Sequence, residues 1–110
     1  ELSKYSSIRQ EVALSKCSLE QARLLTLAAA DKIDRFGVKE AKDLIAMIKI
    51  VVPRMTCEIV DKAIQAHGGM GVCEDTPLPI FWLYGRTLRL ADGPDEVHMY
   101  QLGRNIIDSY

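Results

Sequence analysis

The sequence predicts an all-α fold, an antiparallel helix bundle in one domain of 110 residues. Apolar residues recur at spacings of three and four in two long segments, roughly residues 5–36 and 38–67. No segment alternates between apolar and polar residues for long enough to predict a strand. Glycine and proline lie between the helical segments, where they end one helix and begin the next.

The first long segment is predicted to end at Phe36-Gly37, since glycine commonly closes a helix. We expect this helix to be deeply buried, because its apolar face is wide. The second segment keeps its helical period through Pro53, which favours one kinked helix over two helices that meet there. The stripe of the first helix consists of Ile8, Val12, Leu19, Ala22, Ala29 and Ile33.

Two shorter helices follow the run Gly68-Gly69-Met70-Gly71, which is predicted to end the second helix. Asp75-Thr76-Pro77 supplies a capping side chain and a first-turn proline for a helix of about residues 77–90. Pro94-Asp95-Glu96 begins the last helix, which extends to about residue 107, since acidic residues suit a first turn. The third helix carries an apolar cluster that is more often core or subunit interface than cofactor site: Ile80, Phe81, Trp82, Leu83 and Tyr84.

Composition excludes several classes of function. With 14 basic and 15 acidic residues the net charge is −1, so nucleic acid is not an expected partner. The apolar runs are too short for a membrane span. Cys17, Cys57 and Cys73 are odd in number and form no C-x-x-C pair, so we expect reduced thiols in an intracellular protein. His98 has no partner at ligand spacing, so no metal site is predicted.

The segment LRLADGPDEVH, residues 88–98, leaves one carboxylate, Asp92, between two predicted helices. The residues alone allow two interpretations of Asp92, a helix cap or a general base presented to a cleft. The glycine-rich turn likewise allows a helix stop or a close approach of bare backbone to a phosphate. Arg86 and Arg89 suit the dipole of a helix end, and Arg104 suits a solvated helix face.

Two motifs, AIQAHGGMG at residues 63–71 and RTLRLADG at residues 86–93, resemble the C-terminal helical domain of the acyl-CoA dehydrogenases. Together with ARLLT at residues 22–26, they are most similar to family members ten and eleven. The resemblance covers about residue 8 to the C-terminus. It implies an FAD-dependent enzyme that converts acyl-CoA thioesters to trans-2-enoyl-CoA in fatty-acid β-oxidation.

The resemblance also implies a role for each matching residue. Asp92 matches the catalytic glutamate, which removes the pro-R α-proton while the flavin accepts a hydride from the β-carbon. Gly93 and Arg104 match substrate-binding positions. The implied FAD-binding residues are Gln65, Ala66, His67, Gly68 and Gly69, which line the cofactor of a neighbouring subunit, and Pro94, Asp95 and Glu96, which meet FAD from the same subunit.

Three residues depart from the family pattern. Asp92 is one methylene shorter than glutamate, Pro94 lacks the hydroxyl of the family's threonine, and Glu96 puts a charge where the family has a neutral amide. Some family members carry their base on an earlier helix that this chain does not contain.

The resemblance implies three partners: an acyl-CoA substrate, an electron-transfer flavoprotein, and further copies of the chain in a homodimer or homotetramer. It implies an intracellular location, mitochondrial or else peroxisomal. Residues 1–110 are expected to be a single helical domain of a larger flavoenzyme, inactive without its N-terminal helical and middle β domains. The alternative is a non-catalytic interaction module, such as a truncated isoform, that oligomerises without flavin.

Overall fold

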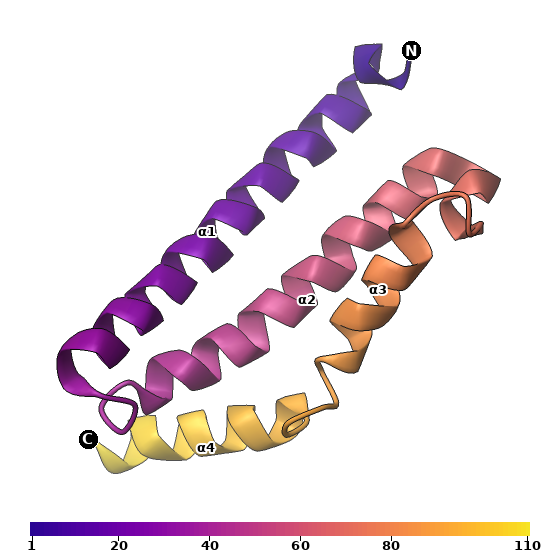
Figure 1. Cartoon of the computed structure of the whole chain (residues 1–110). Helices are drawn as coiled ribbons and strands as arrows, with labels where there is room; N and C mark the ends of the chain where they lie inside the picture. Colours follow the sequence, from indigo (N-terminus) through magenta and orange to yellow (C-terminus); the bar gives the residue numbers. More distant parts are fainter.

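A computed structural model describes all residues from Glu1 to Tyr110. It contains four α-helices and no strand, which confirms the all-α prediction (Figure 1). A short 3-10 turn precedes the first helix and another follows the second. In chain order the elements are η1 (Leu2–Lys4), α1 (Ser6–Phe36), α2 (Lys42–His67), η2 (Gly68–Val72), α3 (Leu78–Thr87) and α4 (Asp95–Asp108).

Helix α2 is the centre of the fold. Helix α1 runs antiparallel along one side of it, and α3 and α4 pack on it elsewhere (Figure 1). Helix α1 contacts neither α3 nor α4, and α3 does not contact α4. The domain is therefore an open, elongated bundle of 51 × 26 × 25 Å. Helix α2 is the only helix that contacts each of the other three.

Glycines end both long helices, as predicted. Gly37 has φ +86° and donates its N–H to the Ile33 carbonyl at 2.8 Å, which closes α1. Gly68 has φ +61° and donates to the Gln65 carbonyl at the end of α2. Residues with a Cβ rarely adopt such backbone angles, so the chain can turn sharply at these two positions only because they are glycine.

Helix α2 continues without a break through Pro53, which is buried. The alternative of two separate helices is therefore wrong. Proline removes one backbone hydrogen bond, but α2 packs against three other helices along its length. Tertiary packing of this kind supplies most of the stability of a helix in a folded protein, and it outweighs the missing bond.

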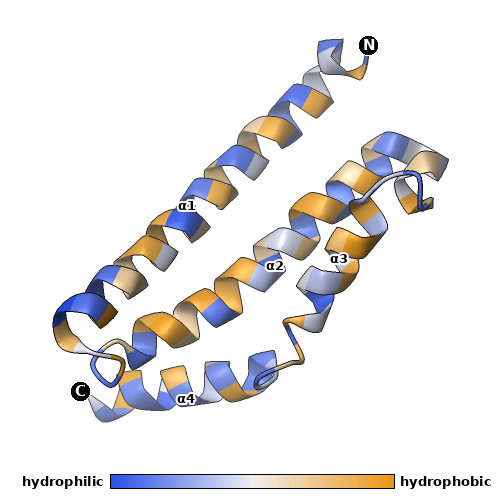
Figure 2. Ribbon diagram, in the orientation of Figure 1, coloured by the Kyte–Doolittle hydropathy of each residue, from blue (hydrophilic) through white to orange (hydrophobic).

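The prediction that α1 is deeply buried is wrong. Only Ala22 and Ala29 of this helix are buried, whereas the side chains of Val12 and Leu24 are each 64% exposed. Apolar residues recur along the whole length of α1 in Figure 2, although α2 is the only long helix that packs against it. A single partner can cover only one stripe of a helix, so the rest of the apolar face stays in solvent.

The α3 cluster was predicted to be core or subunit interface; the structure contradicts the core alternative, and the interface alternative stays a prediction. Four of its members, Ile80, Phe81, Leu83 and Tyr84, are 46% to 65% exposed, and only Trp82 is half-buried. The α3 side that packs on α2 carries Gly85, which lies against Thr56 and Cys57. The small residue lets the two helices cross closely and leaves the aromatic side chains pointing elsewhere.

No helix of the chain has the length and apolarity needed to span a bilayer.

Both ends of α3 differ from the prediction. No side chain caps its start: the Thr76 hydroxyl instead donates to the carbonyls of Met70 at 3.2 Å and Cys73 at 3.4 Å. The helix ends at Thr87, three residues early. Beyond it the Leu90 N–H bonds to the Thr87 carbonyl at 2.9 Å, so the backbone tightens to three-residue spacing.

Candidate functional site

The Asp92 turn, residues 88–94, joins α3 to α4. Asp92 has φ +55° and is the only residue other than glycine with a positive φ, and Gly93 follows it with φ +93°. Two successive left-handed residues reverse the chain sharply. The Asp92 side chain is exposed and forms no ion pair or hydrogen bond within the chain. The turn therefore presents a free carboxylate.

Asp92 is not a helix cap. Helix α4 begins at Asp95 with Pro94 in the capping position, and no side chain bonds to its first backbone N–H groups. The capping interpretation is therefore wrong. The role of Asp92 as a general base stays a prediction.

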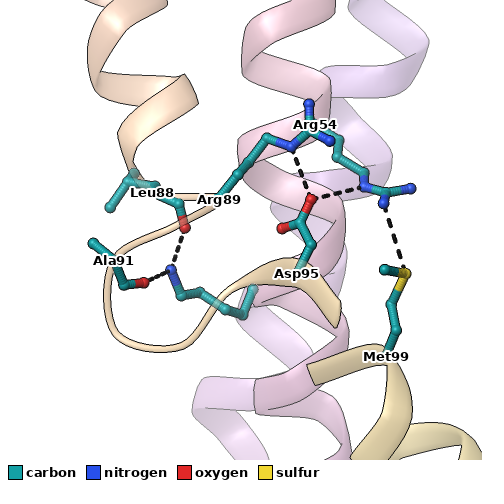
Figure 3. A network of polar contacts seen from close by, with 7 residues as sticks. Arg54, Leu88, Arg89, Ala91, Asp95 and Met99 are labelled. Atoms are coloured by element: carbon teal, nitrogen blue, oxygen red, sulfur yellow. Dashed lines mark hydrogen bonds and ion pairs between the residues drawn. The ribbon is translucent and has the colours of Figure 1, made fainter. Parts of the chain in front are cut away.

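Lys49 of α2 binds the Asp92 turn through two backbone carbonyls. Its ammonium donates hydrogen bonds to the carbonyl oxygens of Leu88 and, at 2.7 Å, Ala91. In Figure 3 these two oxygens converge on one amine nitrogen. Carbonyls at the end of a helix have no partner inside it, and a cation suits them because the dipole is negative there. One side chain thus ties the end of α3 and the residue before Asp92 to α2.

Asp95 ties the other end of the turn to α2. Its carboxylate, 5% exposed as a residue, accepts hydrogen bonds from Arg89 Nε at 2.8 Å and Arg54 Nε at 3.3 Å (Figure 3). Burial by itself raises the pKa of Asp95, but the hydrogen bonds and charges of Arg89 and Arg54 outweigh it, so the pKa lies below its ordinary value. The carboxylate stays ionised and joins α2, the turn and α4.

His98 of α4 contacts the turn directly. Its Nε2 lies 3.2 Å from the Asp92 carbonyl oxygen. A carbonyl oxygen only accepts, so this nitrogen carries the proton in the contact. A Cβ at position 93 would lie 2.9 Å from the same Nε2, so Gly93 is needed both for its positive φ and for the close approach of the imidazole.

The glycine turn, residues 68–72, precedes α3 in the chain, whereas the Asp92 turn follows it, so the ten residues of α3, roughly 15 Å of helix, lie between the two turns (Figure 1). A Cβ added at Gly68 or Gly69 would meet nothing within 4 Å. Gln65 and His67 are exposed, Ala66 is half-buried, and His67 Nδ1 lies 2.7 Å from the Ala63 carbonyl. A groove of about 650 Å³ between α1 and α2 reaches this turn and is lined in part by Ile8, Val12, Ile59, Gln65 and Ala66.

The structure separates the predicted site residues into three groups. One group consists of Asp92, Gly93 and Pro94 in the Asp92 turn with Asp95 and Glu96 at the start of α4. A second group consists of Gln65, Ala66 and His67 at the end of α2 with Gly68 and Gly69 in η2. Arg104 lies apart on the exposed side of α4, with its Nε 3.4 Å from Asp108. Nine residues of helix between Asp95 and Arg104 correspond to roughly 14 Å along the axis.

Lys49 and Arg54 were not expected from the sequence to contribute to this site. Both lie on α2, and their contacts reach residues 39 to 45 positions further along the chain. Lys49 interrupts the apolar run from Ile48 to Val52. A charged side chain that is buried among apolar residues needs a specific partner, and this is the one sequence feature that could have pointed to Lys49. Arg54 carried no such signal.

The model of the acyl-CoA dehydrogenase C-terminal domain matches residues 1–107. The chain belongs to the acyl-CoA dehydrogenase family. It is 52% identical to acyl-CoA dehydrogenase family member 11 of Gallus gallus over 93 residues, 84% of this chain and 12% of that protein. It is 48% identical to family member 10 of Mus musculus over 98 residues, 89% of this chain and 9% of that protein. The predicted resemblance to members ten and eleven is confirmed.

A solved structure of a Mycobacterium abscessus protein assigned as an acyl-CoA dehydrogenase has the same fold. It superposes with a TM-score of 0.96 at 39% identity, over 99% of this chain and 27% of that one. The chain therefore spans about a quarter or less of the length of the acyl-CoA dehydrogenases it matches.

Proposed function

We propose that this chain is the C-terminal helical part of an FAD-dependent acyl-CoA dehydrogenase that forms trans-2-enoyl-CoA from acyl-CoA in fatty-acid β-oxidation. Family membership supports the reaction class. The observation that carries the proposal is the free Asp92 carboxylate on a turn held at both ends. The N-terminal helical and middle β domains belong to the same protein, and the 110 residues alone are inactive.

In this proposal Asp92 is the general base. The α-proton of a thioester is weakly acidic, so the base must lie within hydrogen-bond reach of it in a fixed orientation. The rigid turn supplies that orientation, and Gly93 and Arg104 contribute contacts to the substrate. FAD, when bound, accepts the hydride from the β-carbon. The shorter arm of Asp92 compared with glutamate requires the substrate to approach this turn more closely.

The accessible backbone at Gly68 and Gly69 fits the FAD of a neighbouring subunit, because open space above both residues lets a cofactor approach the main chain. Gln65, Ala66 and His67 complete that surface. On the other turn, Pro94 and Glu96 are the accessible contacts. Asp95 contributes by holding them in place, since its own carboxylate is bound by two arginines.

The proposal includes the partners of such an enzyme. Acyl-CoA is the substrate, an electron-transfer flavoprotein reoxidises the flavin, and the protein is a homodimer or homotetramer in the mitochondrion. These assignments rest on the resemblance to the family. The exposed large apolar side chains of α1 and α3 support the oligomer, because apolar surface that a chain leaves uncovered is typical of association sites.

The decisive experiment is Asp92→Asn in the full-length protein that carries this chain. Asparagine keeps the shape of the side chain and removes its basicity. FAD and acyl-CoA therefore still bind, while flavin reduction slows by about a hundredfold or more. Stopped-flow bleaching of the flavin by acyl-CoA measures this rate. Asp61→Asn, which changes an exposed aspartate on α2, is the matched control and leaves the rate unchanged.

Two outcomes decide the assignment of Asp92. Bleaching at the wild-type rate in a folded, flavin-loaded Asp92→Asn enzyme would contradict it and direct attention to a base outside this chain. Activity of Asp92→Glu with a shifted chain-length preference would support it, because glutamate extends the arm by one methylene.

The same exposed apolar side chains favour a second candidate function, a non-catalytic interaction module that pairs with other chains. The two candidates differ in flavin content. The acyl-CoA dehydrogenase purifies yellow with bound FAD, whereas the module associates with partner chains without flavin. The absorption spectrum of the purified full-length protein distinguishes them.

A further inference from the structure

The backbone at Asp92 is held in a conformation that an L-residue does not adopt freely. A left-handed conformation costs roughly 1–2 kcal/mol for most residues, although aspartate tolerates it better than bulkier ones. Such a conformation persists only where its surroundings determine it. The contacts around the turn therefore decide the direction of the Cα–Cβ bond that carries the Asp92 carboxylate.

The two peptide groups on either side of Asp92 each have a hydrogen-bond partner from another helix. The Ala91 carbonyl belongs to the same planar peptide group as the Asp92 N–H, and Lys49 of α2 bonds to its oxygen at 2.7 Å. The Asp92 carbonyl belongs to the next peptide group, and His98 of α4 lies 3.2 Å from its oxygen. The φ and ψ angles of Asp92 are the rotations that relate these two planes to its Cα.

We propose that Lys49 and His98 are positioning residues that set the direction in which the side chain of Asp92 leaves the backbone, by fixing the peptide plane on each side of its Cα. The proposal rests on the proposed function of Asp92 as the base. Lys49 is expected to have the larger effect of the two, because its ammonium also bonds the Leu88 carbonyl. It thereby fixes the turn relative to both α2 and α3. Neither side chain contacts the substrate.

The neighbouring ion pair has a different function. Arg54 and Arg89 bind the side chain of Asp95, three residues beyond the base, and hold the start of α4 against α2. They fix the position of the turn as a whole. Lys49 and His98 act on the two peptide groups that flank the base, so their loss alters the orientation of Asp92 while the ion pair remains.

The test is Lys49→Met in the full-length flavoenzyme, with Lys42→Met as the control. Methionine keeps the apolar stem of Lys49 and removes its donors. Lys42 lies on the same helix, is exposed and makes no side-chain hydrogen bond. We expect Lys49→Met to lower the rate constant of flavin reduction at saturating acyl-CoA by roughly tenfold to a hundredfold, since small misplacements of a catalytic group have effects of that size. KM stays near the wild-type value, and Lys49→Arg restores part of the rate.

A second readout does not depend on activity. In the same full-length protein, hydrogen exchange of the amides in residues 88–95 becomes faster in Lys49→Met and stays unchanged in Lys42→Met. If Lys49→Met does not fold, His98→Ala removes the contact to the second peptide group and is expected to lower the same rate constant. A wild-type rate in folded, flavin-loaded His98→Ala or Lys49→Met would overturn the assignment of that residue.

The double variant Asp92→Asn/Lys49→Met separates this inference from the proposed function. If Lys49 acts through Asp92, the double variant is no slower than Asp92→Asn alone. A further full decrease would show that Lys49 acts by another route and would overturn the inference. If Asp92→Asn itself reduces flavin at the wild-type rate, the proposed function fails, whatever Lys49 does.

Discussion

At the scale of single residues, Gly71 shows how tightly the chain folds back on itself after α2. It is buried, and a Cβ added there would lie 2.8 Å from the Cα of Ile64 and still closer to the Ile64 carbonyl oxygen. Backbone atoms cannot move aside as the end of a flexible side chain can. The short turn η2 thus packs on the end of α2 only because position 71 has no side chain.

Gly71→Ala is expected to lower the free energy of unfolding of the 110-residue chain by about 1–3 kcal/mol, because the added methyl overpacks a backbone contact. Urea unfolding followed by circular dichroism measures this change. Gly69→Ala is the matched control in the same turn, since an added Cβ meets nothing within 4 Å there. Equal effects of the two substitutions would show that the close packing at Ile64 does not matter for stability.

At the scale of elements, three connections hold α4 and its turn against α2. Lys49 bonds the turn, Arg54 bonds Asp95 at the start of α4, and Asn105 Nδ2 donates to Asp43 Oδ1 at 2.8 Å near the end of α4. All three cross from α2 to the last third of the chain. Helix α2, which contacts the three other helices, therefore also positions the proposed base.

Asp95→Asn is expected to lower the free energy of unfolding at neutral pH by about 1–3 kcal/mol, because it leaves Arg54 and Arg89 without their shared carboxylate. The folded pKa of Asp95 is depressed, so its ionised form contributes stability above the pH range near 4 where an unfolded aspartate titrates. That contribution is lost as the pH falls through the lower folded pKa.

The difference between wild type and Asp95→Asn is therefore expected to shrink in strong acid, where wild-type Asp95 is also uncharged. Urea unfolding at a series of pH values measures it. Asp108→Asn, which removes an exposed ion pair with Arg104, is the control and changes stability little. A difference that stays constant down to strong acid would contradict the assigned role of the Asp95 charge.

At the scale of the whole molecule, the chain leaves much of its apolar surface uncovered. Only nine of 110 residues are buried, and the buried apolar set consists of small side chains: Ala22, Ala29, Ala41, Ala46 and Cys57. Large apolar side chains line the outer faces of α1 and α3 instead. This distribution is typical of a domain whose outer faces pack against other protein surfaces.

The 110-residue chain is accordingly expected to self-associate, and Tyr84→Ser is expected to weaken the association roughly tenfold or more, because exposed aromatic residues often dominate an interface. Sedimentation velocity over a range of concentrations measures this. Tyr110→Ser, which changes an exposed tyrosine at the chain end, is the control. A chain that stays monomeric at high concentration would contradict the prediction.

The sequence by itself determined the four helices and where the two long ones stop, because apolar spacing and glycine act within a few residues of the chain. Gly37 and Gly68 were found this way. The break between two predicted helices singled out Asp92, and the resemblance to the family then implied its role as the base. The prediction that Asp75-Thr76 caps α3 was wrong, because the Thr76 hydroxyl donates to two carbonyl oxygens outside the helix.

Only the tertiary structure decided which faces are covered and what holds Asp92. Periodicity shows that a helix has an apolar face, but the arrangement of the other helices decides whether anything covers it, and α1 has α2 alone. Lys49 and Arg54 reach partners 39 to 45 positions away. No local pattern specifies contacts at that range, because they exist only once α2 has packed against the segment that carries Asp92.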